Sequence, residues 1–221
     1  MTDAGGRREA RTGEQVRDHL LTQINAALRR PGMFGGEIAL RIHFDAMAFA
    51  DDREQAWNEE RDSLQARGAF LSTGVRGAFE SLWGAGTDDM AASVYAEFAH
   101  RHGWLHPDRI LSRDEYDELI GVSRVWGGSD RTLGQTLGMF GPPSLHCGGP
   151  NPYFPKTLVY AAGHSRDPLF CFHFWNELLD SRTDQTALYD EPMLLAVRSE
   201  GSDFAGSFAF TPAGTNRRRG A

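Results

Sequence analysis

The spacing of hydrophobic residues changes at Gly141. Before this residue they recur every three or four positions, which is the period of an amphipathic helix. Beyond residue 156 the pattern has a period of two, which indicates strands. Between the two patterns, the segment 141–156 carries five prolines and several glycines, which favours an irregular loop. Helices followed by strands predict an α+β fold, with a helical N-terminal half followed by a small antiparallel sheet.

The same patterns predict the domain organisation. We expect residues 1–11 to form a disordered lead, because no large apolar residue follows Met1 there. Residues 213–221 are expected to be a flexible basic tail that carries Arg217, Arg218 and Arg219. Between them we expect a single domain over 12–212, which is helical over 12–140, a Pro/Gly loop over 141–156 and β-rich over 157–212.

Helix starts are marked by capping residues. Thr12 with Gln15 and Ser112 with Glu115 match the capping box, in which each side chain binds a free backbone N–H of the other residue. Helices are expected over 14–29, 37–50, 53–66, 75–83, 88–103, from 112 onward and over 130–139. Strands are expected over 157–162, 169–175, 192–199 and 204–211.

Composition and charge exclude some classes of protein. The 221 residues carry a net charge of -7, which argues against a nucleic-acid binder. No apolar run approaches the ~20 residues of a membrane span, and the N-terminus does not resemble a secretory signal. Two cysteines are too few for a disulfide scaffold, so we expect both to be reduced in the cytoplasm. Lysine occurs once among 23 basic residues, an arginine bias typical of GC-rich bacterial genomes.

The segment Arg30-Pro31-Gly32-Met33-Phe34-Gly35-Gly36 resembles an Arg-Pro-Gly-Met-aromatic-x-Gly motif. This motif occurs in a set of small uncharacterised bacterial proteins, some of which look like immunity or interaction proteins. It also opens the type II topoisomerase ATPase domain, but residues 40–52 lack the Glu and Asn pair which that ATPase requires. In physical terms, Pro31 ends a helix, Gly32 permits a positive φ, and Met33 and Phe34 fold back onto the core.

Cysteine and histidine gather in the C-terminal half. In the predicted strand 169–175, Cys171 and His173 share one face, while Phe170, Phe172 and Phe174 share the other and require a core. Two chemical hypotheses remain open. One is a zinc site that uses Cys147, His164, Cys171 and His173. The other is a cysteine nucleophile with a histidine base, which pairs either Cys147 with His173 or Cys171 with His146. Cys171, His173 and Glu177 are the catalytic candidates.

Both chemical hypotheses compete with simpler structural roles. Neither the metal ligands nor the nucleophile has the spacing of a known signature, and a buried cysteine usually packs as a small hydrophobe. No cofactor is therefore favoured. Glu177 is expected at the solvated start of a helix.

Two segments are candidates for binding. The loop 141–156 presents Tyr153, Phe154 and Lys156 on a shape restricted by proline, and loops of this kind often carry function. The acidic run Asp51 to Glu60 surrounds Trp57, which is a candidate anchor for a basic partner. The sequence thus predicts a non-enzymatic, immunity-like interaction protein of the cytoplasm, with a protein partner. The alternatives are the Cys/His enzyme or metalloprotein, and a small-molecule binding domain with a pocket between sheet and helices.

Overall fold

The protein is described by a computed structural model over residues 12–180, 185–199, 201 and 203–220. The predicted lead 1–11 lies outside these residues. Helices come first along the chain and an antiparallel sheet follows, which confirms the predicted α+β fold. The helices are α1 (Gly13–Arg29), the 3-10 helix η1 (Pro31–Phe34), α2 (Gly36–Ala50), α3 (Glu54–Ala66), α4 (Gly74–Trp83), α5 (Asp88–Arg101), α6 (Arg113–Trp126), α7 (Leu133–Phe140), the 3-10 helix η2 (Ala205–Ser207) and α8 (Pro212–Gly220).

The strands largely match the predicted ranges. They are β1 (Leu145–Gly148), β2 (Lys156–Tyr160), β3 (Phe170–Trp175), β4 (Leu178–Asp180), β5 (Gln185–Ala187), β6 (Met193–Arg198) and β7 (Phe208–Phe210). In the described part of the chain, one antiparallel sheet has the order β1-β2-β3-β6-β7, and β4 pairs with β5 separately. β1 was not predicted: it lies within the Pro/Gly segment, where Leu145 and Cys147 alternate inward and pair with β2.

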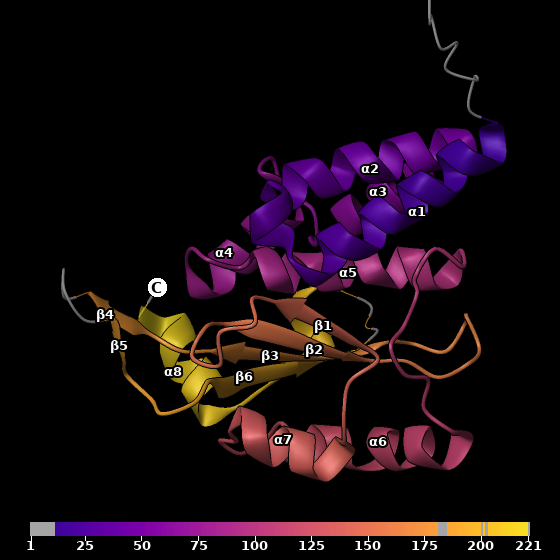
Figure 1. Cartoon of the computed structure of the whole chain (residues 1–221). Coiled ribbons are helices and arrows are strands. Elements are labelled where there is room, and N and C mark those ends of the chain that lie inside the picture. Colours follow the sequence, from indigo (N-terminus) through magenta and orange to yellow (C-terminus); the bar gives the residue numbers. More distant parts are fainter. Residues whose placement is uncertain (1–11, 181–184, 200, 202, 221) are drawn as a thin grey trace, which may run out of the picture.

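Helices cover both faces of the sheet (Figure 1). α6 and α7 lie against one face of the sheet, and α4 and α5 lie on the side of the opposite face. α1, α2 and α3 form an outer layer beyond α5. Phe170, Phe172 and Phe174 of β3 face α6 and pack with Tyr116 and other buried residues, so the prediction of one buried aromatic face is confirmed.

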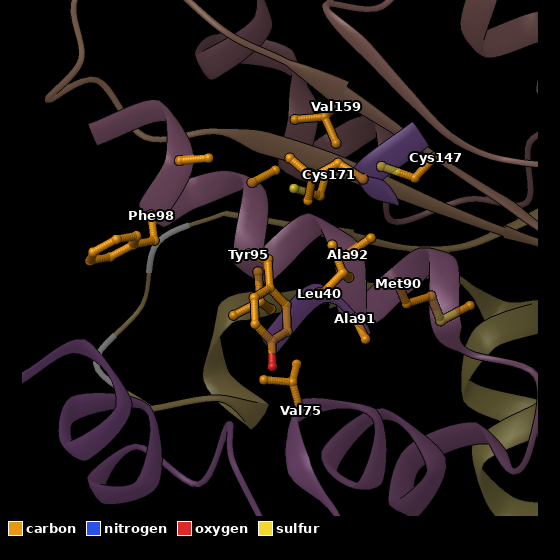
Figure 2. Packing of buried hydrophobic residues seen from close by; sticks show 14 of the residues in the cluster. Leu40, Val75, Met90, Ala91, Ala92, Tyr95, Phe98, Cys147, Val159 and Cys171 are labelled. Carbon is orange, nitrogen blue, oxygen red and sulfur yellow. The ribbon is translucent and has the colours of Figure 1, made fainter. Parts of the chain in front are cut away.

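α5 joins the helical half to the sheet. It is buried along most of its length, with alanines where its neighbours approach closely. Figure 2 shows Ala92 toward Val159 and Cys171 of the sheet, and Tyr95 toward Val75 of α4. One cluster of buried hydrophobic residues therefore extends from the outer helices through α5 to the sheet. Among the helices that the structure describes, none is both long enough and apolar enough to cross a membrane.

Both predicted capping boxes are present. Thr12 Oγ1 accepts from the backbone N–H of Gln15 at 3.3 Å, and the Gln15 side chain accepts from the backbone N–H of Thr12 at 3.1 Å. Ser112 and Glu115 make the same pair of bonds at the start of α6. The two helix starts thus agree with the sequence because a capping box satisfies backbone donors locally.

The Arg-Pro-Gly-Met motif folds differently in detail from its prediction. η1 follows α1 directly, and the left-handed backbone falls at Gly35 and Gly36, with φ of 96° and 67°, rather than at Gly32. Met33 and Phe34 are exposed instead of folding back onto the core. The reason is that Leu40 and Phe44 of the following helix already fill the core beside α1.

The predicted flexible tail is a helix up to Gly220. Thr211 Oγ1 accepts from the N–H of Gly214 at 3.0 Å, and Pro212 stands at the first helical position, where its missing N–H costs nothing. Gly214 packs against the backbone of Leu195 so closely that a Cβ would lie 1.9 Å from the Leu195 oxygen. α8 therefore belongs to the packed structure.

Candidate functional site

Three buried polar side chains form a hydrogen-bonded chain between α5 and the sheet. Thr157 Oγ1 donates to Asp89 Oδ2 at 3.0 Å and lies 3.0 Å from His173 Nδ1. While Asp89 is ionised, the single proton of the Thr157 hydroxyl goes to that carboxylate, so His173 Nδ1 donates to Thr157. The Nε2 atom of His173 is then an acceptor, and it has no hydrogen-bond partner in the described residues.

Burial sets the protonation states of Asp89 and His173 in this row of hydrogen-bonded side chains. Desolvation raises the pKa of Asp89 to about 7 and lowers the pKa of His173 well below its ordinary value. The His173 ring is neutral and lies among the rings of Phe79, Trp83 and Phe208. The arrangement resembles an acid–hydroxyl–imidazole relay, but its members are almost completely removed from solvent. It fastens α5 to the sheet.

The candidate zinc ligands do not come together. Cys147, Cys171 and His173 lie on the sheet face toward α5, but Cys147 and His173 are separated by the strand that carries Thr157. His164 is exposed in the turn between β2 and β3, where its Nδ1 accepts from the N–H of Arg166. Across the described residues, no three His, Cys, Asp or Glu side chains are grouped to hold a metal ion.

The two thiols are buried and protonated. Burial raises the pKa of Cys171 to about 11, although the guanidinium of Arg198 lies 3.4 Å from its sulfur and opposes the shift. Burial also raises the pKa of Cys147 well above its ordinary value. Since the thiolate is the nucleophile, this geometry gives no support to cysteine catalysis.

Glu177 does not start a helix as predicted. It is an exposed residue between β3 and β4, and its backbone oxygen accepts from the N–H of Leu188 at 2.7 Å. The Asn176 side chain bonds the backbone of Tyr189 with both its amide atoms, which holds the β4–β5 hairpin against the end of β3. Glu177 therefore lies apart from the buried Cys171 and His173.

The loop 141–156 exposes fewer binding residues than predicted. Tyr153 is 48% exposed and Phe154 is half-buried. Lys156 is only 3% exposed, and its Nζ donates to the backbone oxygen of Asn151 at 2.8 Å, so it closes the loop from inside. Burial lowers the pKa of this lysine. Tyr153 remains the side chain that this loop offers to a partner.

Trp57 is a core residue and not an exposed anchor. It is 2% exposed, its Nε1 donates to Asp45 at 2.6 Å, and its ring packs against Phe44 and Phe98 at centroid distances of 5.3 and 5.0 Å. The charged neighbours of Trp57 in sequence lie on the outer face of α3, while the indole turns inward. Charge in the flanking sequence therefore misled the prediction.

The large exposed apolar surface of the outer layer lies on α2. We call Ile38, Ile42 and Phe49 the α2 ridge; their exposed fractions are 71, 60 and 75%. Ile38, Ile42 and Phe49 are four and seven positions apart, which places them on one face of the helix. α2 has a second apolar face, formed by Leu40, Phe44 and Met47, and this one is buried.

Acidic side chains lie beside one end of the α2 ridge. Asp45 is exposed between Ile42 and Phe49, and Asp52, Glu54 and Glu59 are exposed beyond the end of α2. Asp51 is used internally: Arg17 at 2.7 Å and Trp104 Nε1 at 2.9 Å bind it and hold its pKa below the ordinary value. Part of the predicted acidic face is thus structural and part is open to solvent.

Comparison of the chain with protein-family models, curated proteins and solved structures finds no match.

Proposed function

We propose that this protein is a non-enzymatic interaction protein that binds a basic protein partner, with the α2 ridge at the centre of the interface. The observation that carries the proposal is the ridge itself, because three large apolar side chains on one face of α2 remain in solvent. Exposed apolar patches with a polar rim are typical of protein interfaces. The immunity-like class suggested by the Arg-Pro-Gly-Met motif belongs to the same proposal, since that motif leads directly into α2.

Charge identifies the chemistry of the partner. The chain carries a net charge of -7, and Asp45, Asp52 and Glu54 lie along or beside the α2 ridge. Of the arginines nearby, Arg17 is bound to Asp51, Arg61 lies 3.7 Å from Asp45, and Arg41 lies over the ring of Phe70 at 5.4 Å. A partner with lysine or arginine around an apolar centre complements this surface, and opposite charge accelerates its association.

Burial weakens the enzyme alternative. The side chains with reactive chemistry, Cys147, Cys171 and His173, are enclosed between α5 and the sheet. In the loop 141–156, Tyr153 is the residue that we propose as a second contact with the partner.

A site-specific photocrosslink tests the proposal. A benzoylphenylalanine replaces Ile42 on the α2 ridge in one variant and Val125 in the other. Val125 is a matched control, because it is 79% exposed on α6, across the sheet from α2. We expect the Ile42 variant to crosslink one basic protein in stoichiometric amount and the Val125 variant to crosslink none.

Binding of the purified partner then completes the test. Ile42→Glu is expected to weaken binding by about 30-fold or more, while Val125→Glu leaves it unchanged. The affinity should also fall with salt, because exposed carboxylates contribute. The proposal is overturned if Ile42→Glu and Val125→Glu bind the partner equally well. It is also overturned if the crosslinker at Ile42 captures nothing, or captures only a second copy of the chain.

A further inference from the structure

The exposed stripe of α2 has the spacing of a coiled-coil seam. Ile38, Ile42, Asp45 and Phe49 follow one another at intervals of four, three and four residues, and all four are exposed. All remaining residues between Ile38 and Phe49 are buried or half-buried. Alternating intervals of four and three are those of the a and d positions of a heptad, and so narrow a stripe is typical of a helix that packs against one other helix. We call these four residues the α2 seam.

The core holds α2 in place from behind, so the seam is formed before a partner binds. Leu40, Phe44 and Met47 on the opposite side of the helix are 0% exposed and belong to the large buried cluster. α2 itself lies in the outer layer of helices (Figure 1). The seam is about 17 Å long, which is about three helical turns. A partner therefore has to order only its own segment, and a helix of about four turns is long enough to cover the seam.

Asp45 is the polar residue of the seam. Its side chain is 55% exposed, although Trp57 Nε1 donates to its Oδ1 at 2.6 Å and Arg61 lies 3.7 Å from the same atom. A carboxylate has about four acceptor sites, so Asp45 can bind a further donor. A helix that covers the seam removes water from this carboxylate. An apolar residue opposite Asp45 is then costly, whereas a cation there is favourable.

A second copy of the chain does not provide this cation. In a parallel pair of α2 helices, Asp45 would face the same carboxylate of the second copy, and like charges repel. In an antiparallel pair, Ile38 would face Phe49 of the second copy and Asp45 would face Ile42, which leaves the carboxylate without a cation. The seam therefore favours a different chain, since a polar residue at an a or d position selects the partner and the register.

We propose that the α2 seam receives one amphipathic helix of the partner, with apolar residues at three a or d positions and a lysine or arginine opposite Asp45. This inference rests on the proposed function, and it names the structural element of the partner and the position of its charge. The apolar residues of that helix pack against Ile38, Ile42 and Phe49. The cation opposite Asp45 fixes the register of the two helices.

Synthetic helical peptides of about three heptads test the inference, and fluorescence anisotropy measures their binding to the full chain. Four core positions of each peptide face the seam; three carry leucine and one carries lysine. The lysine is third among them in one peptide, for a parallel helix, and second in the other, for an antiparallel helix. Each peptide has an isomer in which this lysine and a glutamine of the outer face are exchanged, so that composition and net charge are unchanged. We expect one lysine peptide to bind at least about tenfold more tightly than its isomer.

Variants of the chain localise the charge. Asp45→Asn keeps an acceptor for Trp57 and removes the negative charge, so we expect it to weaken binding of the preferred lysine peptide by about tenfold and to leave binding of the isomer unchanged. Asp52→Asn is the matched control and should not weaken binding of the lysine peptide. Asp52 is an exposed aspartate beyond the end of α2, and asparagine tolerates its positive φ of 53°.

The inference is overturned if no lysine peptide binds, if the lysine peptides and their isomers bind equally, or if Asp45→Asn and Asp52→Asn weaken binding to the same extent. The photocrosslink at Ile42 distinguishes these failures from failure of the proposed function. If Ile42 captures a basic protein but one of these three results is found, the partner does not dock through a helix paired with Asp45, and this inference alone is overturned.

Discussion

The hydroxyl of Tyr95 on α5 donates a hydrogen bond of 2.7 Å to the carboxylate of Glu37 on α2. The same carboxylate accepts from the backbone N–H groups of Val75 and Arg76, both at 2.7 Å, at the start of α4. One buried side chain therefore joins three helices and caps one of them. Gly74 makes this possible, because a Cβ there would lie 2.4 Å from Glu37 Oε1.

Replacement of Glu37 is expected to destabilise the fold. Glu37→Gln exchanges one acceptor oxygen for an amide nitrogen that faces backbone donors, so the free energy of unfolding should fall by about 1–3 kcal/mol. Glu54→Gln is the control and should change it by less than about 0.5 kcal/mol, because Glu54 is exposed. Urea unfolding measures both values. Equal stability of the two variants would refute the role of Glu37.

Truncation of Trp57 separates a core role from an interface role. Trp57→Ala is expected to lower the free energy of unfolding by about 3–5 kcal/mol, because it leaves a cavity beside Phe44 and Phe98. Phe49→Ala on the α2 ridge serves as the comparison and should have a far smaller effect, since Phe49 is exposed. If Trp57→Ala leaves the free energy of unfolding unchanged, Trp57 does not have a core role and is again a candidate binding residue.

Asp89 makes stability depend on pH. Its folded pKa is about 7, above the value of about 4 in an unfolded chain, so the folded state holds the proton more tightly. This contribution stabilises at low pH and is lost as the pH rises from about 4 to about 7. His173 acts in the opposite direction, because its lowered pKa makes stability increase with pH up to about 6.5.

Asp89→Asn removes the first effect and keeps the second. We therefore expect its free energy of unfolding to rise more steeply between about pH 5 and pH 7 than that of the wild type. Urea titrations at several pH values measure the two slopes, and a double variant Asp89→Asn, His173→Gln should flatten the profile. Parallel profiles for wild type and Asp89→Asn would show that Asp89 does not titrate in this range.

The cap of α8 holds the C-terminal helix on the sheet. Thr211→Val removes the hydroxyl that accepts from Gly214 N–H and donates to Leu194, so we expect a loss of about 1–2 kcal/mol. Hydrogen exchange over 212–220 should become faster. Thr22→Val on the exposed face of α1 should leave exchange there unchanged. Slow exchange in Thr211→Val would mean that other contacts of α8 are sufficient to hold it, among them the stacking of Arg217 on Trp175 at 3.7 Å and the hydrogen bond from Trp83 Nε1 to Gly214 O.

Local signals were sufficient for the starts of α1 and α6 and for the two faces of β3. A capping box satisfies backbone donors with residues three positions apart, and alternation along a strand decides which side chains share a face. The start of α8 had the same kind of signal in Thr211 and Pro212, although it was predicted to be a tail. The β4–β5 hairpin beyond Glu177 is short and had no comparable signal.

The candidate sites depend on residues that are far apart along the chain. Asp89, Thr157 and His173 meet because α5 packs on β2 and β3. Contacts between such distant residues cannot be predicted from the spacing or the composition of the sequence.

The sequence by itself determined the class of the fold, most helices and strands, and the excess of negative charge. Tertiary structure alone decided which of the two apolar faces of α2 is exposed as the ridge. It also decided that the side chains of Trp57 and Lys156 are buried. The physical reason is that periodicity marks a face as apolar, whereas burial depends on which neighbouring element packs against that face.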